Sequence, residues 1–234
     1  SPEKLELTLE QVAGTRIDPA FSDKVAVADT GRLIDQPIAG PGSGLKASFN
    51  YPGHIAWRRV GDKQELYILD LYSNAVRRAT AAYDGDFKDG IVETIAGKVR
   101  DYTRDTGRYK YTVTVGESGP AAEGAARAVA FGFGKYDPAD PDQASSGESA
   151  LAVDAALDRV FIGDAFNRAL RMLDLKTGQV RTLVAHDPSR LEGDSRRVQV
   201  SALMGPMALL PDHSLLWVDL DKSIVRRLHL EFGL

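Results

Sequence analysis

The 234-residue sequence contains no cysteine, which excludes disulfides, thiolate metal sites and cysteine nucleophiles. No apolar run approaches the ~18 residues that a membrane-spanning helix needs, so membrane insertion is not expected. There is no long basic block, and the formal net charge is only −4, so attraction to nucleic acid is not indicated. Long helical periodicity is also missing, whereas 22 glycines and 11 prolines are scattered along the chain. These features favour an all-β fold with many turns.

The sequence leaves the cellular compartment open. Residues Ser1–Lys4 are polar and do not resemble a signal peptide. A mature, processed chain would begin in the same way. If the chain is such a processed form, a periplasmic or secreted location is favoured.

The clearest structural pattern lies between Gly44 and Gly97. Apolar or alternating segments are separated by turn signals, including a tight turn at Ser73-Asn74, and this pattern predicts four short strands. The expected strands are His54–Trp57, Glu65–Asp70, Ala75–Ala79 and Ile91–Ala96. Four consecutive short strands of this kind are typical of one blade of a β-propeller.

An apolar strand that ends in aspartate and is followed by arginine seven positions later occurs three times. The pairs are Asp70–Arg77, Asp164–Arg171 and Asp219–Arg226. In a hairpin centred on a two-residue turn, positions i and i+7 would face each other and could form a cross-strand ion pair. Each exposed pair would contribute under ~1 kcal/mol, so we interpret the three as structural register markers.

The spacing of these aspartates sets the expected blade count. Asp29 to Asp70 spans 41 residues and Asp164 to Asp219 spans 55, and both fit one blade, whereas the 94 residues from Asp70 to Asp164 do not. The excess lies at 98–148, which is either a degenerate blade or an insertion. We therefore expect residues 1–234 to form one β-propeller domain of four or five four-stranded blades, with an incomplete set of six as a further alternative.

The last blade ends after its third strand, at Ser223–Phe232. Residues 4–13 alternate apolar and polar side chains, which predicts a strand. Pairing this strand with the last blade would close the ring and remove two exposed sheet edges. An open fragment that another chain completes is the alternative.

The first complete blade resembles the NHL repeat, in which a Gly-x-Ala-x-Phe-x-x-Pro header leads to an Asp-ended strand, an Asn turn and an Ile/Val-Arg pair. The matching residues are Gly44, Ala47, Phe49, Pro52, Asp70, Asn74, Val76 and Arg77. A second match carries Asp164, Asn167, Leu170 and Arg171, and a third carries Pro206, Asp219, Val225 and Arg226. The resemblance implies a propeller that binds proteins in most cases, sometimes RNA or sugars. A minority of related propellers are metal-dependent lyases or hydrolases.

Within a blade, the loops that enter the innermost strand lie on the same face as the loops between strands two and three. One surface should therefore collect exposed aromatic and basic side chains, the residue types that anchor interfaces. The candidate binding residues on it are Tyr51, His54, Tyr72, Phe166 and Arg168, with Arg104 and Tyr109 from the 98–148 segment.

No coherent catalytic or metal site is expected. The four histidines do not repeat at one blade position, whereas a catalytic metal usually needs three protein ligands. Gly-Glu-Ser occurs at 116–118 and 147–149, but the Gly-x-Ser-x-Gly elbow of a serine nucleophile is absent. The acidic loop Asp84–Asp89 lacks the spacing of a calcium loop. No cofactor is therefore expected.

The sequence thus predicts a non-enzymatic scaffold that presents one loop face and the 98–148 segment to another protein, as a subunit of a larger assembly. The alternative is a metal-dependent lyase or hydrolase with a site in the central channel near His54. Fold alone does not choose between these two functions.

Overall fold

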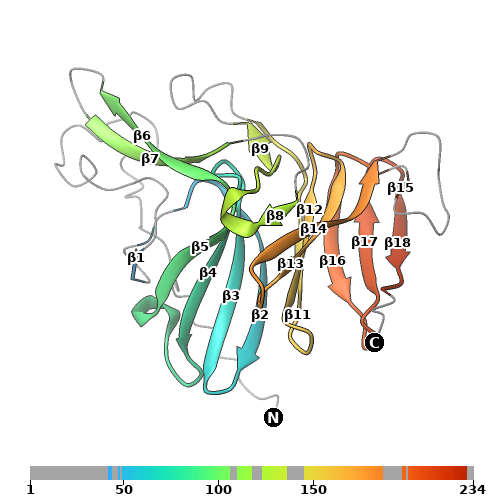
Figure 1. The fold of residues 1–234 in the computed structure, drawn as a ribbon, viewed down its shortest axis with the longest axis horizontal. Helices are drawn as coiled ribbons and strands as arrows, with labels where there is room; N and C mark the ends of the chain where they lie inside the picture. Colours follow the sequence, from blue (N-terminus) through green and yellow to red (C-terminus); the bar gives the residue numbers. More distant parts are fainter. Residues whose placement is uncertain are drawn as a thin grey trace, which may run out of the picture.

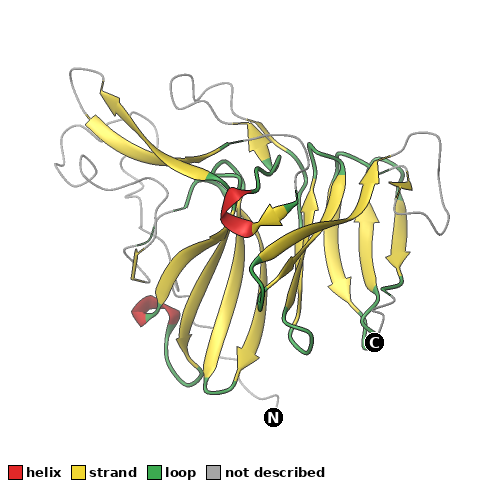
Figure 2. Ribbon diagram, viewed as in Figure 1, coloured by secondary structure: helices red, strands yellow, loops and turns green. Residues whose placement is uncertain are grey.

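The computed structural model describes residues 42–43, 47, 49–105, 110–117, 123–135, 145–186, 197–198 and 200–230. Strands dominate these residues, with short 3-10 turns between them (Figure 2). The elements, in chain order, are β1 (Gly42–Ser43), β2 (Pro52–Val60), β3 (Lys63–Asp70), β4 (Ala75–Ala82), η4 (Phe87–Asp89), β5 (Ile91–Ala96), β6 (Val99–Asp105), β7 (Lys110–Gly116), β8 (Gly124–Ala125), η5 (Ala126–Ala128), β9 (Gly134–Lys135), β10 (Ser145–Ser146), β11 (Leu151–Asp154), β12 (Arg159–Asp164), β13 (Ala169–Asp174), β14 (Gln179–His186), β15 (Arg197–Val198), β16 (Met204–Leu209), β17 (Leu215–Asp219) and β18 (Ile224–Leu228).

The fold is all-β, with three main sheets that follow one another along the chain (Figure 1). The first sheet has the order β1-β5-β4-β3-β2, and its four long strands are the ones expected from the sequence between Gly44 and Gly97. The second sheet has the order β11-β12-β13-β14-β15, with β8 also paired to β14. The third sheet is the antiparallel meander β16-β17-β18. The predicted N-terminal strand at 4–13 lies outside the described residues.

The second sheet is packed on both of its faces. Successive side chains of a strand point to opposite faces of its sheet. On β12, Val160 and Ile162 therefore join a core with the first sheet, while Phe161 between them joins a core with the third. On β11, Leu151 and Ala152 divide in the same way. This double burial explains why the strands of the second sheet are nearly continuous apolar runs.

Three equivalent turns connect the second and third strands of the sheets, and they differ from the predicted two-residue turns. Asp70 pairs with Ala75, so four residues form the turn, and Asn74 ends it at φ 45°. Arg168 at φ 47° and Ser223 at φ 54° end the other two turns in the same left-handed conformation. The prediction that Asp and Arg lie directly opposite each other is therefore wrong, because Arg77 pairs with Ile68. Asp70 and Arg77 are diagonal neighbours on one face, which a long side chain can span.

The 98–148 segment consists of two hairpins on either side of a core segment. The β6-β7 hairpin projects from the first sheet, and β9 pairs with β10 in the second hairpin (Figure 1). Between them, Val129, Phe131 and Phe133 are at most 1% exposed and belong to the core shared by the first and second sheets.

The described helical segments are single 3-10 turns. No helix in this part of the chain is long and apolar enough to cross a membrane.

Candidate functional site

Two tyrosines stack at the end of the first sheet where its second and third strands are joined. The rings of Tyr51 and Tyr72 lie 4.7 Å apart and are inclined by 15°. Tyr51 is 56% exposed and adopts φ 64°, a left-handed conformation that costs a non-glycine residue free energy. The backbone N–H of Leu71 donates to the carbonyl oxygen of Tyr51 at 3.1 Å, which helps to hold this conformation.

The core segment that follows β8 carries the aromatic surface from the first sheet to the second. The side-chain oxygen of Asn74 accepts hydrogen bonds from the N–H groups of Phe133 and Gly134, at 2.7 and 3.0 Å. At the next turn, the N–H of Phe166 donates to the carbonyl of Gly132 at 2.8 Å. This segment therefore lies between the two turns and fixes Tyr72 relative to Phe166.

Basic groups accompany these aromatic rings. The ammonium nitrogen of Lys135 lies 5.5 Å from the centre of the Phe166 ring, within the range of a cation–π contact. The guanidinium of Arg168, in the same turn as Phe166, lies 3.3 Å from Nε2 of His186. We call Tyr51, Tyr72, Lys135, Phe166 and Arg168 the loop face.

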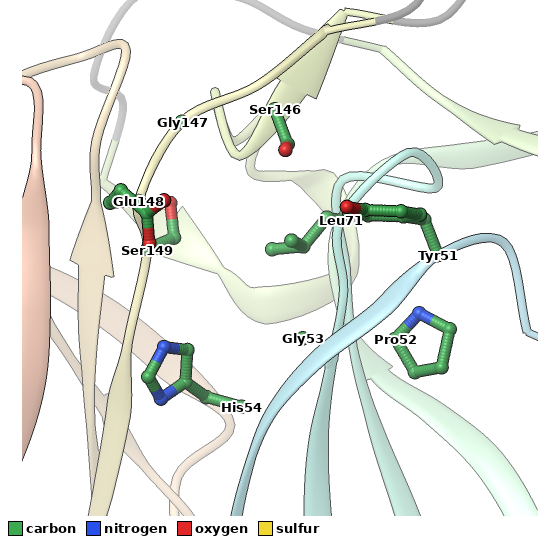
Figure 3. A pocket seen from close by; sticks show the side chains of 9 residues that line it. All are labelled: Tyr51, Pro52, Gly53, His54, Leu71, Ser146, Gly147, Glu148 and Ser149. Atoms are coloured by element: carbon green, nitrogen blue, oxygen red, sulfur yellow. The ribbon is translucent and has the colours of Figure 1, made fainter.

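A pocket of about 240 Å³ opens beside the loop face (Figure 3). It lies between the start of β2 and the segment that leads from β10 into β11. The residues that line it are Tyr51, Pro52, Gly53, His54, Leu71, Ser146, Gly147, Glu148 and Ser149. Close packing forms its walls: a Cβ on Gly53 would lie 2.8 Å from the Leu71 side chain, and a Cβ on Gly147 would lie 2.8 Å from that of Ala165.

Three polar groups meet at the pocket. Burial lowers the pKa of His54 below its ordinary value, and the negative charge of Glu148 opposes this shift in part. His54 is therefore neutral at pH 7. Figure 3 shows its imidazole turned toward the strand that carries Glu148 and Ser149. The Ser149 side chain is fully buried, and its Oγ has no hydrogen-bond partner among the described residues.

The three Asp–Arg pairs lie at the equivalent turns of the three sheets. The Nε of Arg171 is 3.2 Å from Asp164 and that of Arg226 is 2.8 Å from Asp219, while Nη1 of Arg77 is 3.4 Å from Asp70. The expectation of exposed pairs is wrong for the first two sheets, because all four side chains there are 0% exposed. Backbone N–H groups also reach these carboxylates, from Asn50 to Asp70 at 2.6 Å and from Gly132 to Asp164 at 2.7 Å.

The structure brings together most of the binding residues named from the sequence. Tyr51, Tyr72 and Phe166 lie at the turns, with Arg168 beside them and His54 in the pocket. Arg104 lies on β6, away from this group, and Tyr109 is outside the described residues.

Sequence reasoning missed three residues that contribute to the site: Lys135, Glu148 and Ser149. The sequence of Gly147-Glu148-Ser149 is compared with a serine nucleophile motif, and this comparison does not point to a pocket. The available signal was the pair of phenylalanines at Phe131 and Phe133, which marks a buried segment that carries the following residues to the loop face.

Within the described part of the chain, no group of three or more His, Asp or Glu side chains is placed to hold a metal ion.

No family model matches the chain, and no curated protein matches it. Among solved structures, it is similar to an auxiliary nutrient binding protein from Bacteroides ovatus, with 16% identity and a TM-score of 0.39 over 74% of this chain and 36% of that one. It is also similar to a protein of unknown function from Bacteroides thetaiotaomicron, with 14% identity and a TM-score of 0.38 over 75% and 46% of the two chains. The chain thus spans less than half the length of these proteins.

Proposed function

We propose that the three sheets are blades of an NHL-type β-propeller, and that the protein is a non-enzymatic scaffold whose loop face binds another protein. The observation that carries this proposal is the group of aromatic and basic side chains at two adjacent turns, of which Tyr72 is half-buried and the others are exposed: Tyr51, Lys135, Phe166 and Arg168. Tyrosine, arginine and other large side chains of this kind supply most of the binding energy at protein interfaces. The proposed ring is closed by residues 4–13 on the open edge of β18.

The rival proposal, a metal-dependent lyase or hydrolase around His54, has less support. The described pocket supplies one imidazole and one carboxylate, whereas a catalytic zinc site usually uses three protein ligands. Elemental analysis of the purified protein would test it directly, since tightly bound zinc or calcium in equimolar amount would favour the enzyme.

The double variant Tyr72→Ala/Phe166→Ala tests the loop face. A partner would first be identified by cross-linking and affinity capture from an extract of the source organism, and its affinity would then be measured by surface plasmon resonance. We expect the double variant to weaken binding at least about tenfold, because two interface anchors are lost.

Tyr83→Ala is the matched control for this experiment. Tyr83 is 44% exposed and lies beyond the opposite end of β4, with Arg59 stacked 3.7 Å over its ring. Its removal should leave the affinity unchanged. Equal losses for the control and the double variant, or no loss for either, would contradict a loop-face interface.

The β6-β7 hairpin can be tested by excision, because its two ends meet. The N–H of Glu117 donates to the carbonyl of Lys98 at 2.8 Å, and their side chains form an ion pair at 2.6 Å. Replacing 99–116 with two glycines should therefore leave the melting temperature within a few degrees of the parent value. We expect partner affinity to fall. Unchanged affinity in a folded variant would remove the hairpin from the interface and leave the loop face as the binding surface.

A further inference from the structure

The pocket beside the loop face presents hydrogen-bond acceptors to whatever enters it. The Glu148 carboxylate only accepts, a neutral imidazole has one accepting ring nitrogen, and a serine hydroxyl can accept as well as donate. These three groups belong to Glu148, His54 and Ser149. The Oγ of Ser149 is fully buried behind this lining and has no partner among the described residues, so the acceptors open to a ligand are those of Glu148 and His54.

The charge of the pocket is negative at neutral pH. Glu148 forms no ion pair with any described residue, and the pocket lining contains no lysine or arginine. The single basic group of the lining, His54, is held neutral by burial. An anionic ligand would therefore be repelled by Glu148, whereas a cation would gain the only unpaired charge at the site.

Apart from Ser146, the remaining side chains of the lining are apolar or aromatic. Leu71 and Pro52 line one side, next to the Tyr51 ring that stacks on Tyr72 (Figure 3). At about 240 Å³, the pocket is smaller than the 300–1,000 Å³ typical of drug-sized ligands. Its shape thus suits a short aliphatic stem that ends in a polar head.

We propose that this pocket binds a primary ammonium group on an aliphatic stem, namely a lysine side chain of the partner protein. The N–H donors of the ammonium match the carboxylate oxygens of Glu148 and the accepting ring nitrogen of His54. The stem packs against Leu71 and Pro52, and the Tyr51 ring lies at the mouth. This assignment rests on the proposed function, because it places the pocket within the same protein-binding surface.

The test uses the whole chain and small probes, so it does not depend on finding the partner. Binding of Nα-acetyl-lysine-N-methylamide would be followed by two-dimensional amide NMR, with the norleucine analogue as the uncharged control. We expect the lysine probe to shift the amide signals of Gly53 and Gly147, and the norleucine probe to bind at least tenfold more weakly. Equal binding of the two probes, or binding of neither, would overturn the proposal.

Variants locate the interaction. Glu148→Gln keeps the shape of the side chain and removes its charge, and it should weaken lysine-probe binding about tenfold or more, since charge-assisted hydrogen bonds are the stronger ones. Glu117→Gln removes a carboxylate outside the pocket and should have no effect. A Glu148→Gln protein that melts normally and binds the probe with unchanged affinity would contradict the assignment.

The pH profile separates this site from a simple acidic patch. Glu148 is the charged group that acts on His54 among the described residues. Protonating His54 removes an acceptor and places a positive charge beside the ammonium, so affinity should fall between pH 7.5 and 5 in the parent protein. The fall should disappear in His54→Gln. Persistence of the same fall in that variant would count against the His54 role.

Further arms distinguish the sources of the ligand. If n-butylamine bound as tightly as the lysine derivative, the ligand would be a free alkylamine. The proposal that the pocket takes a lysine of a partner protein would then be overturned. Binding of methyl β-glucoside in place of the ammonium probes would assign the pocket to neutral polyols and overturn it fully. The lysine probe could still bind the Tyr72→Ala/Phe166→Ala variant, or partner capture could fail for the parent protein. If both happened, the pocket assignment would be supported and the proposed protein-binding function would be contradicted.

Discussion

Replacing Arg171 with methionine is expected to destabilise the protein by about 3–5 kcal/mol. Arg171 and Asp164 are both 0% exposed, and the arginine also donates to the Thr182 hydroxyl at 2.5 Å. Removing one partner leaves the other as an uncompensated buried charge, and breaking buried pairs in this way has costs of this size. Urea denaturation at pH 7.5, followed by tryptophan fluorescence, would measure the loss.

Two further variants serve as controls for this effect. Arg226→Met should cost less, because the side chain of Arg226 is 10% exposed. Adding Asp164→Asn to Arg171→Met should recover part of the lost stability by removing the orphaned charge. A loss below about 1 kcal/mol for Arg171→Met would show that the pair does not stabilise the second sheet.

The free energy of unfolding is expected to depend on the charge of Asp70. Burial raises the pKa of Asp70 to about 7 from an ordinary value of 3.8, against the opposing effects of Arg77 and the Asn50 N–H. Between these two pH values the folded protein holds a proton that the unfolded chain has lost. The contribution of Asp70 therefore favours folding fully below about pH 4 and is lost as pH rises through about 7. The difference between the two pKa values corresponds to about 4 kcal/mol.

Asp70→Asn isolates this contribution, because asparagine keeps an oxygen that can accept the Asn50 N–H and cannot titrate. The stability difference between parent and variant, measured by urea denaturation from pH 4.5 to 8, should change by several kcal/mol in favour of the variant. Asp84→Asn, at an exposed turn, controls for the loss of one carboxylate from the chain. A difference that stays constant over this range would mean that Asp70 is already ionised at pH 5.

The elements of the first sheet could be predicted from sequence because each strand is short and bounded by turn residues. Ile91–Ala96 has the expected limits, and the other three strands differ from expectation by extension at their ends. The turns could not be predicted in detail. Ser73-Asn74 can form a two-residue turn or end a four-residue turn. The left-handed φ of Asn74 is compatible with both turn types, so the residue types alone do not choose between them.

The burial of the Asp–Arg pairs also could not be predicted from the sequence. An Asp seven positions before an Arg has the same spacing on an exposed face as on a buried one. Phe49 packs beside Arg77, and the first sheet packs against the second. These contacts determine whether the face that carries the pair is buried or exposed. The aromatic residues of the loop face could be predicted because they lie in turns next to recognisable strands. The position of Glu148 and Ser149 at the pocket could not be predicted, because it depends on a long-range contact. The N–H of Met204 reaches the carbonyl of Glu148, 56 positions earlier in the chain.

The hydrogen bonds that the N–H groups of Phe133 and Gly134 donate to the Asn74 side chain have a consequence for the kinetics of association at the proposed interface. They hold Tyr72 and Phe166 at a fixed separation before any partner arrives, so ordering these side chains costs little entropy on binding. A surface that is preorganised in this way docks almost as a rigid body. Differences in affinity among partners would then arise mainly from differences in the dissociation rate constants of the complexes.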